Sequence, residues 1–342
     1  MYWTAIITLP RLLEYKAPLG APKVFMQKTL PIVIPIFALI LAGYICRKRQ
    51  LLGETAASEL NKFVVYLALP ALLFDVLSHT QLSTLNQPRF LLAYCLSSAL
   101  VFSGALALRL FQSRHIVDAS IDSLGASYAN TGFIGLPLCA LTLGSESLAP
   151  AIIATILTVC VVFAAGVFFV ELGLQQERHM GKVLSVITLK LLRNPLILAP
   201  LAGIAYSLCG FTTPAPAEQF LKLLGGAATP CALVSIGLFL AAEKSVEQKI
   251  PVPGARRNAL FLVALKLIAQ PALTWLLVMR VLPLPPIWAN TAILMSALPT
   301  GTGPYMLAEF YHREAAMTSR VILLSTAASL ITVSVLLGWL QP

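Results

Sequence analysis

Two short stretches place polar, glycine and proline residues inside long apolar runs: "ANTGFIGLP" at residues 129–137 and "ALPTGTGP" at residues 297–304. Glycine and proline both interrupt regular helices, and an interrupted helix leaves backbone N–H and C=O groups without partners. Where a helix restarts, its free N–H groups and partial positive charge suit a carboxylate. The two stretches therefore predict two broken helices whose freed backbone groups bind an anion.

The predicted binding residues come from both stretches, with side-chain hydrogen bonds from the asparagine and the threonines. They are Asn130, Thr131, Gly132, Gly135, Thr300, Gly301, Thr302 and Gly303. The prolines expected to form the crossover or act as hinges are Pro70, Pro137, Pro230, Pro299 and Pro304. The alternative is that both helices are only kinked and packed on their neighbours, because membrane helices tolerate glycine and proline.

Among the ionisable residues within apolar runs, where a charge is costly and often functional, Lys266 and Asp75 are the main candidates. Lys266, in "LFLVALKLIAQPAL", either extends to the headgroups or serves as a cationic partner for the substrate or for an unwound carbonyl. Asp75, in "PALLFDVLS", is either interfacial or the acidic group of a proton-coupled mechanism.

The composition indicates a membrane protein: 58% of residues are hydrophobic, 11% are charged, and the mean hydropathy is +0.84. A soluble domain has roughly 25% charged residues. The net charge of +10 comes from basic residues scattered between apolar runs, so we expect no nucleic-acid partner. The six cysteines lack ligand-like spacing, so we expect neither a metal site nor a cofactor.

Apolar runs of membrane-spanning length predict an all-α membrane protein with ten spans. The spans are Leu30–Cys46, Leu60–Leu77, Phe90–Leu110, Ile121–Leu143, Pro150–Leu172, Val186–Cys209, Ala217–Ala242, Ala259–Val281, Ile287–Tyr311 and Met317–Leu340. The fourth and ninth are the broken ones. Residues 1–25 are too short and interrupted to span, and we interpret them as a non-core N-terminal extension.

Basic residues follow the odd-numbered spans, which the positive-inside rule places in the cytoplasm. That side receives Arg47, Lys48, Arg49, Lys62, Arg109, Arg114, Arg178, Lys182, Lys190, Arg193, Lys244, Lys249, Arg256, Arg257, Lys266, Arg313 and Arg320. The opposite side receives Arg89, Lys222 and Arg280. This pattern predicts a multi-pass protein of the inner (plasma) membrane with both termini outside the cytoplasm.

The chain also repeats itself. Pro70 and Pro230 are 160 residues apart, and Pro137 and Pro304 are 167 apart, each pair lying within matching spans. Two related five-span halves follow, residues 26–178 and 179–342, and because five is odd the second half enters the membrane inverted. Inverted repeats with broken helices are typical of secondary transporters. The alternative is that apolar helices resemble one another by composition alone.

Several motifs in order resemble the auxin efflux carrier (AEC) family, bacterial branch. They are "PIFALILAGYICRKRQLL", "LNKFVVYLALPALLF", "ANTGFIGLPL", "ATPCALVSIGLFLA", "LKLIAQPAL" and "LPTGTGPYMLAEFY", and the resemblance runs from about Met26 to the C-terminus. It implies the bile-acid symporter-like fold, in which spans 1, 2, 6 and 7 form a scaffold and the others a transport domain. The family's Asn-Pro pattern maps to Asn130 and Pro137, whereas the second stretch has no Asn.

The resemblance implies a permease for a small organic anion, since bacterial relatives carry malonate or malate and plant relatives carry auxin. We therefore expect a secondary transporter with elevator-type alternating access, coupled to protons or uncoupled rather than sodium-coupled. The alternatives are a sodium-coupled symporter of the bile-acid type and a channel or sensor subunit. No catalytic motif such as G-x-S-x-G is present, so we expect no enzyme. The expected partners are the organic anion and the lipid bilayer, and a homodimer is left open.

Overall fold

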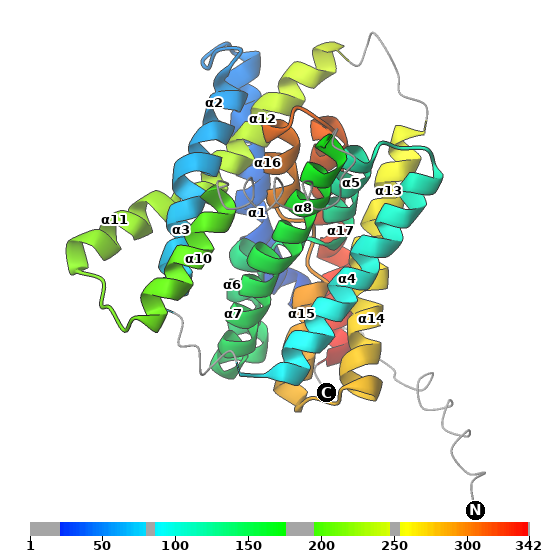
Figure 1. Cartoon of the computed structure of the whole chain (residues 1–342). Helices are drawn as coiled ribbons and strands as arrows, with labels where there is room; N and C mark the ends of the chain where they lie inside the picture. Colours follow the sequence, from blue (N-terminus) through cyan, green and yellow to red (C-terminus); the bar gives the residue numbers. More distant parts are fainter. Residues whose placement is uncertain (1–20, 80–85, 176–194, 247–253, 341–342) are drawn as a thin grey trace, which may run out of the picture.

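A computed structural model describes residues 21–79, 86–175, 195–246 and 254–340. In these ranges the regular secondary structure is helical, apart from one isolated antiparallel pair formed by Ala129 and Thr300. The helices run up and down in one bundle (Figure 1). The predicted all-α class is confirmed for the described ranges. Residues 1–20 of the predicted extension and the start of the predicted span Val186–Cys209 lie outside them.

The helices of the first half of the chain alternate with short links and π-helical turns. They are α1 (Ala21–Lys48), α2 (Ala56–Phe63), α3 (Leu69–Ser78), α4 (Pro88–Phe111), α5 (Ile116–Ser127), α6 (Leu136–Leu143), α7 (Leu148–Ile156) and α8 (Phe163–Leu174). The helices of the second half are α10 (Pro195–Leu208), α11 (Ala215–Gly226), α12 (Ala228–Val246), α13 (Ala255–Ala264), α14 (Gln270–Leu276), α15 (Pro286–Ser296), α16 (Gly303–Phe310) and α17 (Ala315–Leu340).

Six helical stretches of the described residues are long and apolar enough to cross a membrane. They are Ala56–Ser78, Pro88–Phe111, Ser145–Leu174, Ala215–Ala242, Ala255–Val281 and Ala315–Leu340, each lying over a predicted span. A rise of about 1.5 Å per residue makes a run of about 20 residues sufficient for the hydrocarbon core. The chain is thus a multi-pass membrane protein. α1 begins at Ala21, earlier than the predicted Leu30.

Four of the five predicted crossover or hinge prolines lie where helical segments start. Pro70 and Pro137 are the second residues of α3 and α6, and each follows a π-helical turn. Pro304 is the second residue of α16, and Pro230 lies in the first turn of α12. Proline has no N–H to donate, so it is tolerated in a first turn, and a π-helical turn accommodates the missing hydrogen bond.

Close helix packing organises one side of the bundle. α1 packs along α12, and α3 packs along α10 and α11. At the α1–α12 crossing a Cβ on Gly43 would collide with the carbonyl oxygen of Val234, and one on Gly237 with that of Ile40. Glycine at both positions therefore lets the two helix backbones touch.

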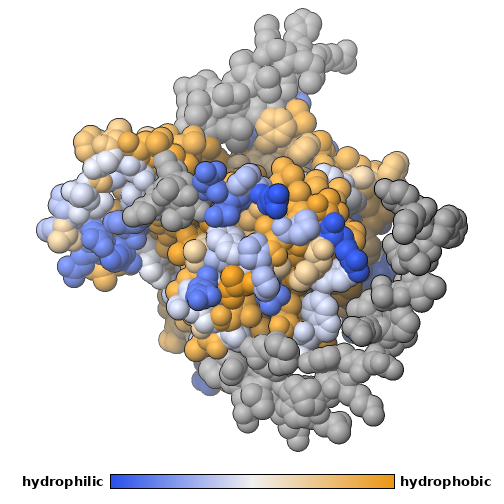
Figure 2. Space-filling view, turned by 90° about the horizontal axis from the view of Figure 1, so that it is seen from below, coloured by the Kyte–Doolittle hydropathy of each residue, from blue (hydrophilic) through white to orange (hydrophobic). Residues whose placement is uncertain are grey.

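The basic helix ends share one end of the bundle. α1 and α4 end there, and α5, α13 and α17 begin there, at the top of Figure 1. These ends carry the arginines that the charge pattern assigned to a single side, among them Arg47, Arg109 and Arg313. Figure 2, the view onto the other end, shows hydrophilic residues over its middle and hydrophobic residues around much of the rim.

Ion pairs hold the helix ends together at this basic end. The buried Arg109 of α4 contacts Asp122 of α5 at 2.6 Å. Arg313, in the link between α16 and α17, donates two hydrogen bonds to Asp118 at 2.6 and 2.9 Å. The bond to Asp118 raises the pKa of the Arg313 guanidinium, which stays charged. Breaking a buried pair such as Arg109–Asp122 costs roughly 3–5 kcal/mol, whereas the more exposed pair of Arg313 and Asp118 contributes less. Together these contacts join the upper ends of α4, α5 and α17.

The close contact between α1 and α12 at Gly237 predicts what one added methyl group would do there. Gly237→Ala should force α12 away from α1 and destabilise the protein by roughly 1–3 kcal/mol, seen as a lower thermal unfolding temperature in detergent. Gly104→Ala in α4 is the matched control, because nothing lies within 4 Å of its Cβ position. An unchanged unfolding temperature for Gly237→Ala would contradict the close packing.

Candidate functional site

The two predicted breaks meet in the structure. α5 ends at Ser127 and α15 at Ser296, and the segments that follow lie side by side and antiparallel. The backbone N–H of Asn130 donates to the carbonyl of Pro299 at 2.8 Å, and the N–H of Gly301 donates to the carbonyl of Tyr128 at 3.0 Å. The broken helices therefore cross and satisfy part of each other's backbone.

Four helical ends converge on this crossing. α5 and α15 end with carbonyl groups that have no partner within their own helix. A π-helical turn (Thr131–Gly135) that leads into α6, and α16, begin with N–H groups that likewise lack the usual partner within the helix. Helix N-termini carry a partial positive charge and C-termini a partial negative one. The crossing thus concentrates both signs of partial charge, as a site for an anion and for a cation would require.

The ring of Tyr128 gives Gly301 and Gly303 a second role. A Cβ on Gly301 would come 2.9 Å from the ring, and one on Gly303 would come 2.8 Å from it. The sequence analysis selected these glycines as helix breakers and did not single out Tyr128. In the structure they also leave room for its side chain, which packs against the ring of Phe163.

Thr300 is used for structure. It is buried, its N–H donates to the Ser325 hydroxyl at 3.1 Å, and its own hydroxyl donates to the Gly125 carbonyl at 2.7 Å. These bonds fasten the second break to α17 and to α5. Thr131 is buried as well.

Asn130 and Thr302 are in a different situation. Both side chains are half-buried, and neither caps the helical segment that it precedes. Asparagine and threonine at such positions usually accept a hydrogen bond from the helix start. The amide of Asn130 and the hydroxyl of Thr302 therefore lie at the crossing but cap no helix start, whereas the hydroxyl of Thr300 holds the Gly125 carbonyl.

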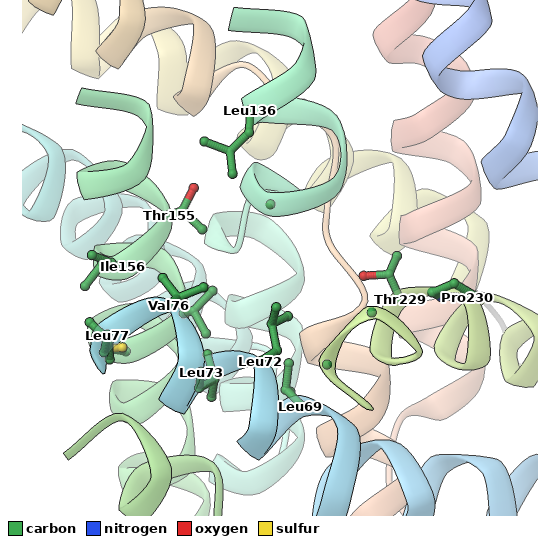
Figure 3. A pocket seen from close by; sticks show the side chains of 15 residues that line it. Leu69, Leu72, Leu73, Val76, Leu77, Leu136, Thr155, Ile156, Thr229 and Pro230 are labelled. Carbon is green, nitrogen blue, oxygen red and sulfur yellow. The ribbon is translucent and has the colours of Figure 1, made fainter. Parts of the chain in front are cut away.

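A cavity of about 310 Å³ lies beside the crossing. α3 lines one side of it with leucine and valine residues, and Leu136 and Thr155 lie across from them (Figure 3). Thr229 and Pro230, at the start of α12, close a further side. Of the predicted residues, Gly132 and Pro230 line this cavity. None of its lining residues in the described part of the chain is charged.

Lys266 lies at the crossing and does not extend to an interface. Its side chain is fully buried, and its Nζ donates to the carbonyl of Ser296, the last residue of α15, at 2.7 Å. Of the alternatives stated for this residue, extension to the headgroups is contradicted, and contact with a carbonyl at a broken helix is observed. Its location excludes it from the cavity lining.

Asp75 lies away from the crossing. Its carboxylate, near the end of α3, is 3.3 Å from the ring of His79, the residue that follows this helix. Its neighbours Val76 and Leu77 line the cavity, while Asp75 does not. Within the described ranges no group of three His, Cys, Asp or Glu side chains could hold a metal ion.

Residues 30–337 match a family model described as membrane transport protein. The chain belongs to the auxin efflux carrier family of membrane transport proteins. The "Putative malonate transporter" of Rhizobium meliloti (strain 1021) is 29% identical over 313 residues, 91% of this chain and 96% of that protein. The "Auxin efflux carrier component 3a" of Oryza sativa subsp. japonica is 28% identical over 145 residues, 41% of this chain and 22% of that protein. An "Uncharacterized transporter" of Methanothermobacter thermautotrophicus is 32% identical over 220 residues, 64% of this chain and 69% of that protein.

The family predicted from the sequence motifs is therefore confirmed. Tyr128, Gln270 and the cavity residues Thr155 and Thr229 were not predicted as site residues, because each looks like ordinary packing within an apolar run. A weak signal existed for Gln270, a buried amide one helical turn from Lys266.

The structural task assigned to Thr300 is testable. Thr300→Val keeps the shape but leaves the Gly125 carbonyl without this donor, and should destabilise the transporter by about 1 kcal/mol. Thr300→Ser, which keeps the hydroxyl, should unfold near the wild-type temperature in the same detergent assay. Equal unfolding temperatures for the Val and Ser variants would show that the hydrogen bond has no such role.

Proposed function

We propose that this family member is a secondary transporter of a small organic anion, a mono- or dicarboxylate, bound between the crossing and the adjacent cavity. The observation that carries the proposal is the meeting of two broken helices, one of which restarts beside a cavity. Gly132 belongs to the first helical turn after one break and lines that cavity. Free N–H groups at a helix start bind carboxylates without a charged side chain. The names of the Rhizobium and rice relatives, which refer to malonate and auxin, agree with this class.

An inverted repeat of ten spans belongs to the same proposal. In it, α1, α2–α3, α10 and α11–α12 are the scaffold, and the broken helices with their neighbours are the transport domain. The packing supports the pseudo-symmetry, because α1 lies on α12 as α3 lies on α10, which pairs first with seventh and second with sixth. We also propose that the basic end of the bundle, at the top of Figure 1, faces the cytoplasm of a plasma membrane and that both termini are outside, because positively charged helix ends favour the cytoplasmic side.

An elevator-type movement is supported by the unequal contacts around the crossing. On the cytoplasmic side, Asn61 of α2 donates to the Met306 carbonyl of α16 at 3.3 Å, and the Tyr305 hydroxyl donates to the Ser235 carbonyl of α12 at 3.4 Å. On the other side, α3 and α6 are separated by the cavity. A transport domain that slides against the scaffold would exchange these contacts and expose the site to the cytoplasm.

Coupling to protons, with Asp75 as the acidic group, also remains our proposal. One oxygen of its carboxylate is buried and lies 3.3 Å from the His79 Nδ1, on a helix that lines the cavity. A sodium-coupled symporter is the alternative for the coupling ion.

Counterflow separates a carrier from a channel or sensor subunit. Proteoliposomes loaded with unlabelled malonate, or with a monocarboxylate such as acetate, should transiently accumulate the labelled anion above equilibrium. A carrier exchanges one substrate for another across the membrane, whereas a channel only equilibrates them. Flux that does not saturate, or an absence of overshoot with every carboxylate, would reject the proposal.

Two side chains should bind the substrate without holding the fold. Asn130→Ala and Thr302→Val should each weaken binding about tenfold or more, because a hydrogen bond to a charged group contributes about 1.5–3 kcal/mol. Binding is measured by titration of the purified protein with the transported anion, and the unfolding temperature should stay near wild type.

Asn258→Ala, at the cytoplasmic start of α13 and likewise half-buried, is the matched control and should bind normally. Unchanged affinity in both site variants would place the substrate elsewhere.

A further inference from the structure

The two half-helices that end at the crossing are capped from one neighbouring helical stretch. The Lys266 ammonium donates to the Ser296 carbonyl at the end of α15, at 2.7 Å. Four residues later, the Gln270 amide donates to the Ser127 carbonyl at the end of α5, at 3.1 Å. Residues four apart in a helix lie on one face, so a single face supplies a donor to each broken end.

Both donors are inaccessible to solvent. Gln270 also donates to the Ser98 hydroxyl of α4 at 3.2 Å, while its amide oxygen is buried without a hydrogen-bond partner. Among the described residues, no carboxylate forms an ion pair with Lys266. In the described residues, the ammonium of Lys266 therefore contacts a backbone carbonyl and not a carboxylate.

Carbonyl groups at the ends of broken transporter helices carry partial negative charge, and in transporters they coordinate Na⁺ or H⁺. Here the donor to such a carbonyl is the ammonium of Lys266, which is part of the protein chain itself. We propose that the Lys266 ammonium, positioned with Gln270, replaces a bound inorganic cation at the crossing, so that the site is assembled without Na⁺ or K⁺. Lys266 then acts as a positioning residue that sets ion independence.

A direct consequence is that a small residue at position 266 creates a cation site. Removing the side chain leaves the Ser296 carbonyl beside the buried space that the lysine side chain filled. Gln270, whose amide oxygen has no hydrogen-bond partner, lies one helical turn away. Oxygen ligands of this kind bind alkali cations. The inference rests on the proposed crossing site for its meaning in transport, but its test uses folding stability without substrate and so stands apart from that proposal.

The experiment compares thermal unfolding of purified wild type and Lys266→Ala in choline, sodium, potassium and lithium chloride at equal ionic strength. Wild type should unfold at one temperature in all four salts. Lys266→Ala should be less stable in choline and should regain several degrees in at least one alkali salt, saturably, as expected when a ligand binds only the folded state.

Three variants separate this effect from general changes. Lys266→Met fills the space without a charge and should be unstable in every salt with no rescue. Lys266→Arg should keep the ion independence of wild type. Lys48→Ala, at the cytoplasmic end of α1, removes a lysine far from the crossing and should show no cation dependence.

The outcomes are decisive in either direction. Rescue of Lys266→Ala alone supports the proposal. Folded Lys266→Ala that unfolds alike in all four salts overturns it, and so does a wild type that sodium stabilises. If Lys266→Ala yields no folded protein, Lys266→Ser takes its place, and carboxylate uptake by wild type in sodium-free choline buffer is measured. Uptake that requires sodium would reject the proposal, while loss of all uptake with intact cation rescue would reject only the transport function.

Discussion

The structure depends on one constraint: backbone groups freed in the middle of an apolar bundle must find partners inside the protein. Neither break could persist alone, because each would leave N–H and C=O groups unsatisfied at a cost of several kcal/mol in lipid. The antiparallel pairing of residues 128–130 with residues 299–301 solves this for both breaks at once. The crossing is therefore a mutual requirement of two distant segments and not two separate kinks.

The remaining features at the crossing follow from that pairing. The segments approach closely enough that Gly301 and Gly303 must lack side chains beside Tyr128. The ends of α5 and α15 still have carbonyl groups to satisfy, and Gln270 and Lys266 supply the donors. At the opposite end of the first break, the turn that leads into α6 starts beside a cavity with an uncharged lining, to which Gly132 belongs. Backbone dipoles thus provide the electrostatics that charged side chains provide elsewhere.

The breaks were predictable because glycine and proline act locally. A proline removes a backbone N–H donor wherever it lies, so the sequence alone predicts that new helical segments begin at Pro137 and Pro304. The partners of a side chain are not local. Thr300 and Thr302 are two residues apart and look alike, yet one hydroxyl holds the Gly125 carbonyl and the other side chain caps nothing. The sequence left two alternatives for Lys266 for the same reason. Only the position of α15 decides whether the Lys266 ammonium contacts a carbonyl or water.

The two halves of the proposed repeat share a backbone plan but not a set of side chains. Asn130 has no counterpart in "ALPTGTGP". Lys266 and Gln270 belong to the second half, and the Gln270 amide donates to the Ser98 hydroxyl of α4 in the first half. A symmetric pair of breaks would offer the same environment to ligands on either side of the crossing. Placing the buried cation on one stretch makes the end of α15 more positive than a lone carbonyl terminus could be. In the proposed transporter, this asymmetry of side chains gives the crossing a defined charge and a defined orientation toward the substrate.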